Sequence, residues 1–206
     1  MRSAYDFARY FIKNGFDANT LDGNMKLQKL LTFANLIHLT KTGQTLFEEP
    51  MQAYNNGCVV EPVRYRYYNN YDGFARESHD FNPDFNQAEY ETLEETIALF
   101  GALSSRELSS IQHEFRFWKE ANAQSDQRIA LAAIIPELDR IRDVLHAKAE
   151  SSTSCMKSEK INDVTFFYDP TFRLTDKIIE QLYNFSWNAD EPAYTIYEED
   201  GELVVY

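Results

Sequence analysis

The stretch Met25-Lys-Leu-Gln-Lys-Leu-Leu-Thr-Phe-Ala-Asn-Leu-Ile-His-Leu-Thr-Lys-Thr-Gly43 carries the strongest helix signal in the chain. Its apolar residues recur at a spacing close to 3.6 and predict one helix buried on one side; they are Leu27, Leu30, Leu31, Ala34, Ile37 and Leu39. Gly43 fits a left-handed C-terminal cap, and either Asp22 or Asn24 can cap the other end. We expect the fold to be organised around this helix.

A connecting arm and a glycine-centred turn follow the central helix. Leu46 and Phe47 predict a return of the chain over the core. Gly57 allows a sharp bend before the apolar pair Val59 and Val60. The helix, the arm and the turn are therefore expected to form one unit.

Other segments before residue 150 also show helical patterns. These are residues 3–14, 61–70 and 87–103, a segment that starts at Ser104 and runs toward Trp118, and most of 129–149. Ser104 and Glu107 have the spacing of a capping box, in which each side chain bonds a backbone N–H of the first turn. Residues 71–86 show no sustained period and are predicted to be a loop.

The pattern changes near the C-terminus. Residues 151–158 are small and polar, as in a linker, and residues 159–206 predict a β-α-β-β appendage. Its elements are a strand within 161–168, a helix over 174–187, and strands at 194–197 and 203–206 joined by a tight turn at 199–201. The predicted class is mainly α with a small β-containing C-terminal appendage, an α+β fold divided into 1–150, the linker and the appendage.

Composition is that of a folded globular protein. The 206 residues are 44% hydrophobic and 15% aromatic, enough for a sizeable core. The sequence shows neither an N-terminal leader pattern nor a run of about 18 apolar residues, so we expect a cytoplasmic protein that does not bind membranes. Cys58 and Cys155 are far apart and lack metal-ligand spacing, which predicts reduced thiols.

The net charge of −13 is unevenly distributed. Residues 1–58 carry 6 basic and 5 acidic side chains, residues 59–150 carry 10 and 17, and residues 151–206 carry 4 and 11. Such a balance argues against binding nucleic acid through its phosphates and favours a basic protein partner. Acidity that only keeps the protein soluble is the simpler interpretation, and both stay open.

Candidate catalytic residues do not form a recognisable pattern. Cys58 and the histidines at 38, 79 and 113 could supply a nucleophile and a base, but their spacing does not place them together. His113-Glu114 lacks the second histidine of a zinc-protease helix, and adjacent glutamates point in different directions. We therefore expect neither enzymatic activity, nor a cofactor, nor a metal. The aromatic residues at 65–74 are expected to be partly core and partly contact surface.

Several motifs together resemble the Panacea domain family, which comprises SocA-like antitoxins and phage-associated proteins. The helix Met25-Lys-Leu-Gln-Lys-Leu-Leu-Thr-Phe-Ala34 is similar to the family pattern lKLQKLLYyA, and Leu46-Phe47 to its LFdE return. The segment from Ala53 to Pro62 resembles aWkyGPVVp, with Cys58 where the family usually has proline. Leu103, Ser104-Ser105, Leu108, His113 and Trp118 are similar to the later helix pattern, so the resemblance covers about residues 1–130.

The resemblance implies an antitoxin that either binds a cognate toxin directly or delivers it to a protease. It also implies that the adjacent gene encodes this toxin. The matched motifs and the appendage are the expected contact surface; the motif positions are Tyr54, Gly57, Val60, His113 and Trp118. An equally simple role for these five is to determine the fold. Two other functions stay open: a phage-borne acidic inhibitor or nucleic-acid mimic that blocks a nuclease or defence complex, and an uncharacterised hydrolase.

Overall fold

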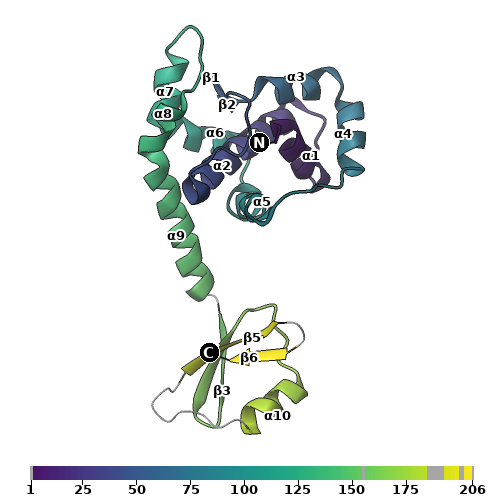
Figure 1. Ribbon diagram of the computed structural model, residues 1–206, viewed down its shortest axis with the longest axis vertical. Coiled ribbons are helices and arrows are strands. Elements are labelled where there is room, and N and C mark those ends of the chain that lie inside the picture. The colour runs from purple at the N-terminus through teal and green to yellow at the C-terminus, as the bar shows by residue number, and fades with distance from the viewer. Residues whose placement is uncertain (1, 155, 185–192, 200–201, 206) are drawn as a thin grey trace. The chain divides into compact units, whose positions relative to one another are not determined.

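The computed structural model describes residues 2–154, 156–184, 193–199 and 202–205 (Figure 1). The chain divides into two compact units, Met1–Val144 and Leu145–Tyr206. The first is helical apart from one short hairpin, and the second contains a four-stranded mixed sheet. The predicted α+β class is therefore confirmed.

The helical unit is built from short helices around one long one. Its elements are α1 (Ala4–Lys13), α2 (Leu21–Thr42), β1 (Gln52–Tyr54), β2 (Gly57–Val59), α3 (Glu61–Asn69), α4 (Tyr71–His79), α5 (Gln87–Phe100), α6 (Ser105–Glu114), α7 (Arg116–Asn122), α8 (Leu131–Ile134), a 3₁₀ turn (Ile135–Glu137) and the first part of α9 (Leu138–Ser154).

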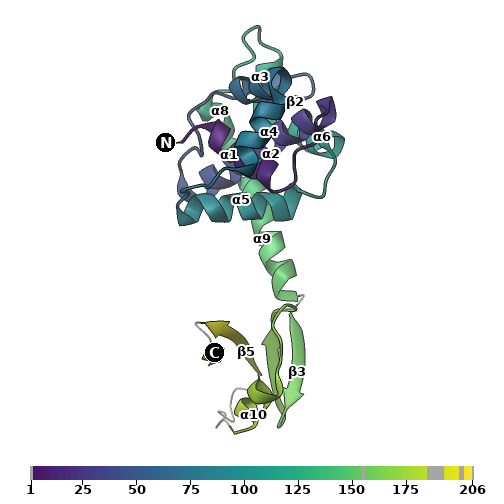
Figure 2. The same ribbon diagram turned by 90° about the vertical axis from the view of Figure 1, so that its right-hand side faces the viewer.

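Helix α2 lies in the middle of this unit (Figures 1 and 2). Every residue from Leu27 to Leu39 is buried, so the expectation of a helix buried on one side is wrong. Helices α1, α3, α5 and α6 and strand β2 all contact α2 and cover its whole circumference. Polar side chains on α2 are consequently enclosed together with the apolar ones.

Local capping signals predict most helix ends. The hydroxyl of Ser3 accepts the Tyr5 backbone N–H, and Gly43 ends α2 with φ +73°. The capping box of Ser104 and Glu107 is confirmed at the start of α6. The predicted cap of α2 is wrong, because α2 begins four residues earlier than the quoted stretch and Thr20 caps it.

Residues 71–79 form helix α4, so the loop predicted for 71–86 is wrong in its first half. The Asn70 side chain accepts the Gly73 N–H (3.2 Å) and caps α4. Phe74 is fully buried and stacks on Tyr5 with ring centroids 4.7 Å apart. Burial of the Phe74 ring therefore favours helix α4, which the polar sequence of this segment does not predict. Of the neighbouring tyrosines, Tyr67 is buried, while Tyr65 and Tyr68 are exposed.

The helix predicted to run from Ser104 toward Trp118 is broken at Phe115. Phe115 is extended (φ −71°, ψ 133°) and separates α6 from α7. The Glu137 carboxylate caps α7 by accepting the backbone N–H groups of Arg116 and Phe117, both at 2.9 Å. This cap comes from a residue about 20 positions away, which no local motif can indicate.

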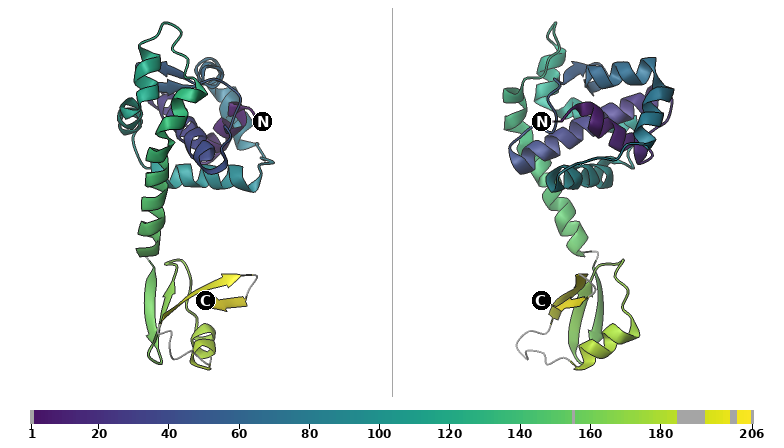
Figure 3. Two further views of the ribbon diagram at one scale, coloured as in Figure 1. Left: turned by 60° about the vertical axis from the view of Figure 1, so that its left-hand side comes forward. Right: turned by 45° about the vertical axis from the view of Figure 1, so that its right-hand side comes forward.

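The C-terminal unit contains β3 (Lys157–Ile161), β4 (Val164–Tyr168), α10 (Asp176–Asn184), β5 (Ala193–Glu199) and β6 (Glu202–Val205). The strands lie in the order β3-β4-β5-β6, with β4 and β5 parallel and the other pairs antiparallel. Helix α10 lies beside the sheet (Figure 3). Its residue Leu182 joins Phe166 and Ile196 in the core of this unit.

Two strands replace the single strand predicted for 161–168. Asn162 and Asp163 have φ of +49° and +66° and connect β3 to β4 in a tight hairpin, so β3 was missed. The predicted turn at 199–201 lies partly outside the described residues. Within the predicted linker 151–158, residues 151–154 belong to α9, and Lys157 and Ser158 belong to β3. A separable appendage at 159–206 stays a prediction.

Candidate partner-binding site around the β1–β2 hairpin

The hairpin of β1 and β2 is the most constrained turn in the helical unit. Tyr54 pairs with Gly57 across the two-residue turn. Gly57 has φ +105°, which side chains rarely adopt. A Cβ atom there would lie 2.5 Å from Oε1 of Gln112 and 2.6 Å from Nζ of Lys29. The backbone therefore favours glycine here, and any side chain would also have to displace the ends of Lys29 and Gln112.

Buried amide side chains hold the hairpin on the helices. Oε1 of Gln112 in α6 accepts the Cys58 N–H (2.9 Å), and Oε1 of Gln28 in α2 accepts the Val60 N–H (2.8 Å). The Ser109 hydroxyl donates to the carbonyl of the residue before Gly57 (2.8 Å). Gln28 and Gln112 are 2% and 0% exposed, so water does not reach these sites. The two amide oxygens therefore satisfy backbone N–H groups that would otherwise be buried without an acceptor.

His113 and Trp118 stack beside the hairpin. Their ring centroids are 3.9 Å apart at an interplanar angle of 23°. The Trp118 indole N–H donates to the carbonyl of Tyr54 (3.1 Å). Burial and, next, the charge of Lys29 lower the pKa of His113, so its imidazole is neutral at pH 7. The break at Phe115 gives the two rings this arrangement.

All five residues expected at the contact surface gather at this hairpin. Tyr54, His113 and Trp118 are half-buried and retain exposed atoms, whereas Gly57 and Val60 are buried. The two buried residues can shape the hairpin, and only the other three can offer side-chain atoms to a partner. Their contact with a partner stays a prediction.

The candidate catalytic residues of the sequence are not brought together as a nucleophile and a base. Cys58 is fully buried, and burial raises the pKa of its thiol to about 12. His38 lies instead beside Thr92, with 3.0 Å between Nδ1 and the hydroxyl oxygen. Among the residues that the structure describes, no three His, Cys, Asp or Glu side chains form a metal-binding group. In the same residues, we find no helix with the length and hydropathy to cross a membrane.

The family model for the SocA-like antitoxin Panacea domain matches residues 27–119. Residues 27–119 are similar to this antitoxin domain, and we call them the Panacea domain. The match begins in α2, includes the hairpin and ends one residue after Trp118. Searches of curated proteins and of solved structures gave no significant match. The matched residues thus include the hairpin, most of α2 and all of α6.

Three polar residues of the Panacea domain were missed as candidate site residues. Gln28, Lys29 and Gln112 are all buried and all approach the hairpin. The signal was present in the sequence, because Gln28 and Lys29 interrupt the apolar residues of the central helix. Their significance depends on the burial of α2 on every side, which the apolar period does not predict.

Proposed function

We propose that this protein is an antitoxin that neutralises a partner toxin by direct protein–protein binding. The observation that carries the proposal is the match of residues 27–119 to the SocA-like antitoxin Panacea domain. An antitoxin family implies a cognate toxin as partner. Delivery of that toxin to a protease is the other mechanism that the resemblance implies.

The contact surface that we propose is the exposed side of the β1–β2 hairpin. Tyr54, His113 and Trp118 offer aromatic surface on a rigid base, because buried hydrogen bonds fix the hairpin. Partly buried aromatic side chains contribute strongly to protein interfaces. The net charge of −13 would accelerate association with a basic toxin.

Co-expression with the product of the adjacent gene tests the proposal. We expect the neighbour alone to arrest growth, and this protein to restore growth and to co-purify with it. Restored growth with loss of the neighbour would favour delivery to a protease. A harmless neighbour that does not bind would contradict the antitoxin function and favour the acidic inhibitor.

Two histidines allow a matched test of the surface. We expect His113→Ala to weaken the complex at least tenfold, because it removes the ring that stacks on Trp118. His79→Ala is the control, since His79 lies at the end of α4 and is exposed. Equal affinities of the two variants, both folded by circular dichroism, would exclude the hairpin face from the interface.

Truncation at residue 158 tests the role of the C-terminal segment. We expect the truncated protein to keep its helical fold, because the helical unit has its own core, and to bind the toxin more weakly. Unchanged affinity would show that residues 159–206 do not contact the toxin.

A further inference from the structure

Lys29 is a buried cation in the middle of the Panacea domain. Its side chain is 1% exposed and points from α2 to the hairpin, where Nζ lies 2.6 Å from the position of a Cβ at Gly57. The structure records no hydrogen bond and no ion pair of this ammonium with any residue it describes. Burying a charge without a partner is costly, so such a lysine calls for an explanation.

The groups around Lys29 are neutral. The pKa of the Cys58 thiol is raised to about 12 by burial, so this thiol carries no negative charge at pH 7. The pKa of His113 is lowered, and its imidazole is neutral too. The side-chain amide nitrogen of Gln112, fixed by the bond between its oxygen and the Cys58 N–H, also lacks an acceptor among the described residues. No neighbouring group therefore balances the ammonium.

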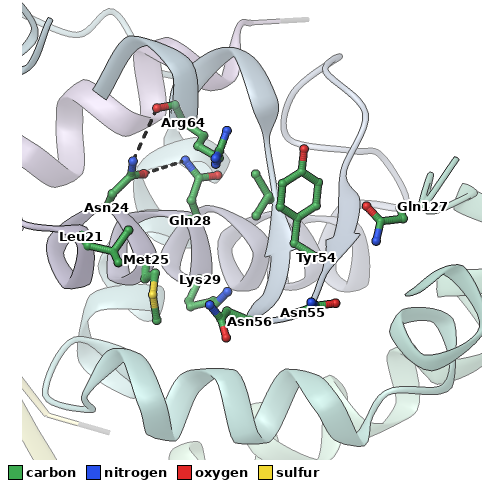
Figure 4. A pocket seen from close by; sticks show the side chains of 11 residues that line it. Leu21, Asn24, Met25, Gln28, Lys29, Tyr54, Asn55, Asn56, Arg64 and Gln127 are labelled. Atoms are coloured by element: carbon green, nitrogen blue, oxygen red, sulfur yellow. Dashed lines mark hydrogen bonds between the residues drawn. The ribbon is translucent and has the colours of Figure 1, made fainter. Parts of the chain in front are cut away.

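Lys29 lines a cavity of about 320 Å³ between the first half of α2, the hairpin and the start of α3 (Figure 4). Asn56 and Gln127 contribute amide groups, and Arg64 contributes a guanidinium that is paired with Glu61 at 3.5 Å. None of the described residues that line it is an aspartate or glutamate, although the chain carries 33 acidic residues. The Lys29 ammonium is thus the unpaired charge among the described residues that line the cavity, in a protein that is acidic as a whole.

The wall of the cavity is pre-organised. Nδ2 of Asn24 donates to the Arg64 carbonyl (3.4 Å), and Nε2 of Gln28 donates to Oδ1 of Asn24 (3.4 Å), as Figure 4 shows. Oε1 of Gln28 in turn accepts the Val60 N–H. These bonds join α2, α3 and the hairpin, so little ordering is needed when a ligand enters.

We propose that this cavity receives a carboxylate of the partner polypeptide, which pairs with the Lys29 ammonium. The inference rests on the proposed antitoxin function and names the chemical group that the site recognises. The volume is near the lower end for ligand sites and suits one side chain or chain terminus. The net charge of the protein weakens the binding of a small free carboxylate, which must therefore be supplied in large excess, whereas a carboxylate on a docked partner is also held by other contacts.

Short peptides test the site without the toxin. The full chain carries ¹³Cε-labelled lysines and is titrated with two pairs of ligands. N-acetylglycine and its amide represent a chain terminus. N-acetylaspartate N-methylamide and its asparagine equivalent represent an acidic side chain. We expect a carboxylate peptide to shift the Lys29 signal and to raise the pKa of Lys29, and its amide to do neither. The pair that responds distinguishes a chain terminus from an acidic side chain. Equal behaviour of carboxylate and amide in both pairs would overturn the proposal.

Toxin binding supplies the second measurement. Lys29→Met keeps the length of the side chain and is expected to weaken the toxin complex at least tenfold. The control is Lys41→Met, which removes the same charge from the exposed end of α2. We expect it to change the affinity less than threefold. Equal affinities would overturn the proposal. If the neighbouring product does not bind the wild-type protein, the antitoxin function fails, and the peptide titration still decides whether the cavity takes a carboxylate.

Discussion

Replacing Lys29 by methionine should stabilise the protein, although the residue lies in the centre of the core. Methionine has a similar length, carries no charge and adapts to irregular surroundings. Lys29 is 1% exposed, and burial lowers its pKa from 10.5 to about 8. This shift measures how much the folded state disfavours the charged lysine relative to the unfolded chain.

The magnitude follows from the shift. At about 1.4 kcal/mol per pKa unit, the folded state loses about 3 kcal/mol by holding Lys29 charged at pH 7. Imperfect packing of the new side chain reduces the gain, so we expect Lys29→Met to add about 1 to 3 kcal/mol to the free energy of unfolding. Such a gain raises Tm by about 2 to 12 °C for a chain of this size.

The assay is urea unfolding of the full chain at pH 7, followed by circular dichroism, with Lys41→Met as control. Lys41 binds Glu91 and Glu95 at 3.4 and 3.2 Å on the exposed surface, so its loss should cost less than about 1 kcal/mol. A loss of stability in Lys29→Met would refute the reasoning, because it would mean that the ammonium has a stabilising partner.

A pH series gives an independent test with a defined sign. Between about pH 8 and pH 10.5 the unfolded chain binds more protons at Lys29 than the folded chain, so the cost of burying Lys29 in the wild type falls as the pH rises. The advantage of Lys29→Met should therefore shrink over this window. The pKa values of Cys58 and Tyr54 are raised in the folded state, so both groups lower stability as the pH rises through the upper part of this window. They are present in both proteins, so the difference between the two stability curves, and not either curve alone, reports Lys29.

Three further outcomes follow from the hairpin. Gly57→Ala should lower the free energy of unfolding by about 3 kcal/mol or more, since it adds a contact at 2.5 Å to an unfavourable φ. Gly43 has φ +73° and open space around it, so Gly43→Ala should lower the free energy of unfolding by only about 1 to 2 kcal/mol. Urea midpoints compare the two, and equal losses would show that the hairpin shifts away. Trp118→Phe should cost about 1 kcal/mol through loss of the 3.1 Å bond to the β1 carbonyl, and an unchanged midpoint would mean that this bond contributes nothing. The pKa of His113, followed by NMR, is lowered in the wild type and should rise in Lys29→Met, because the charge of Lys29 is one cause of the lowering after burial. An unchanged value would mean that the two side chains do not interact.

How much of the candidate site the sequence predicts depends on the range of the interaction. Gly57 and the motif positions Tyr54, His113 and Trp118 were recognised from a pattern, and the structure places them together. The buried amides that fix the hairpin were not predicted. Gln112 is 54 residues from Cys58, and no local spacing relates the two.

The sequence by itself determined the start of α1, the glycine end of α2 and the capping box of α6, because each depends on contacts within a few residues. The tertiary structure decided that residues 27–39 of α2 are enclosed on every side and that residues 71–79 are helical, because packing against distant elements outweighs weak local preferences. For the same reason it alone decided that Lys29, one polar residue of an apolar helix, is a buried cation at the floor of a cavity.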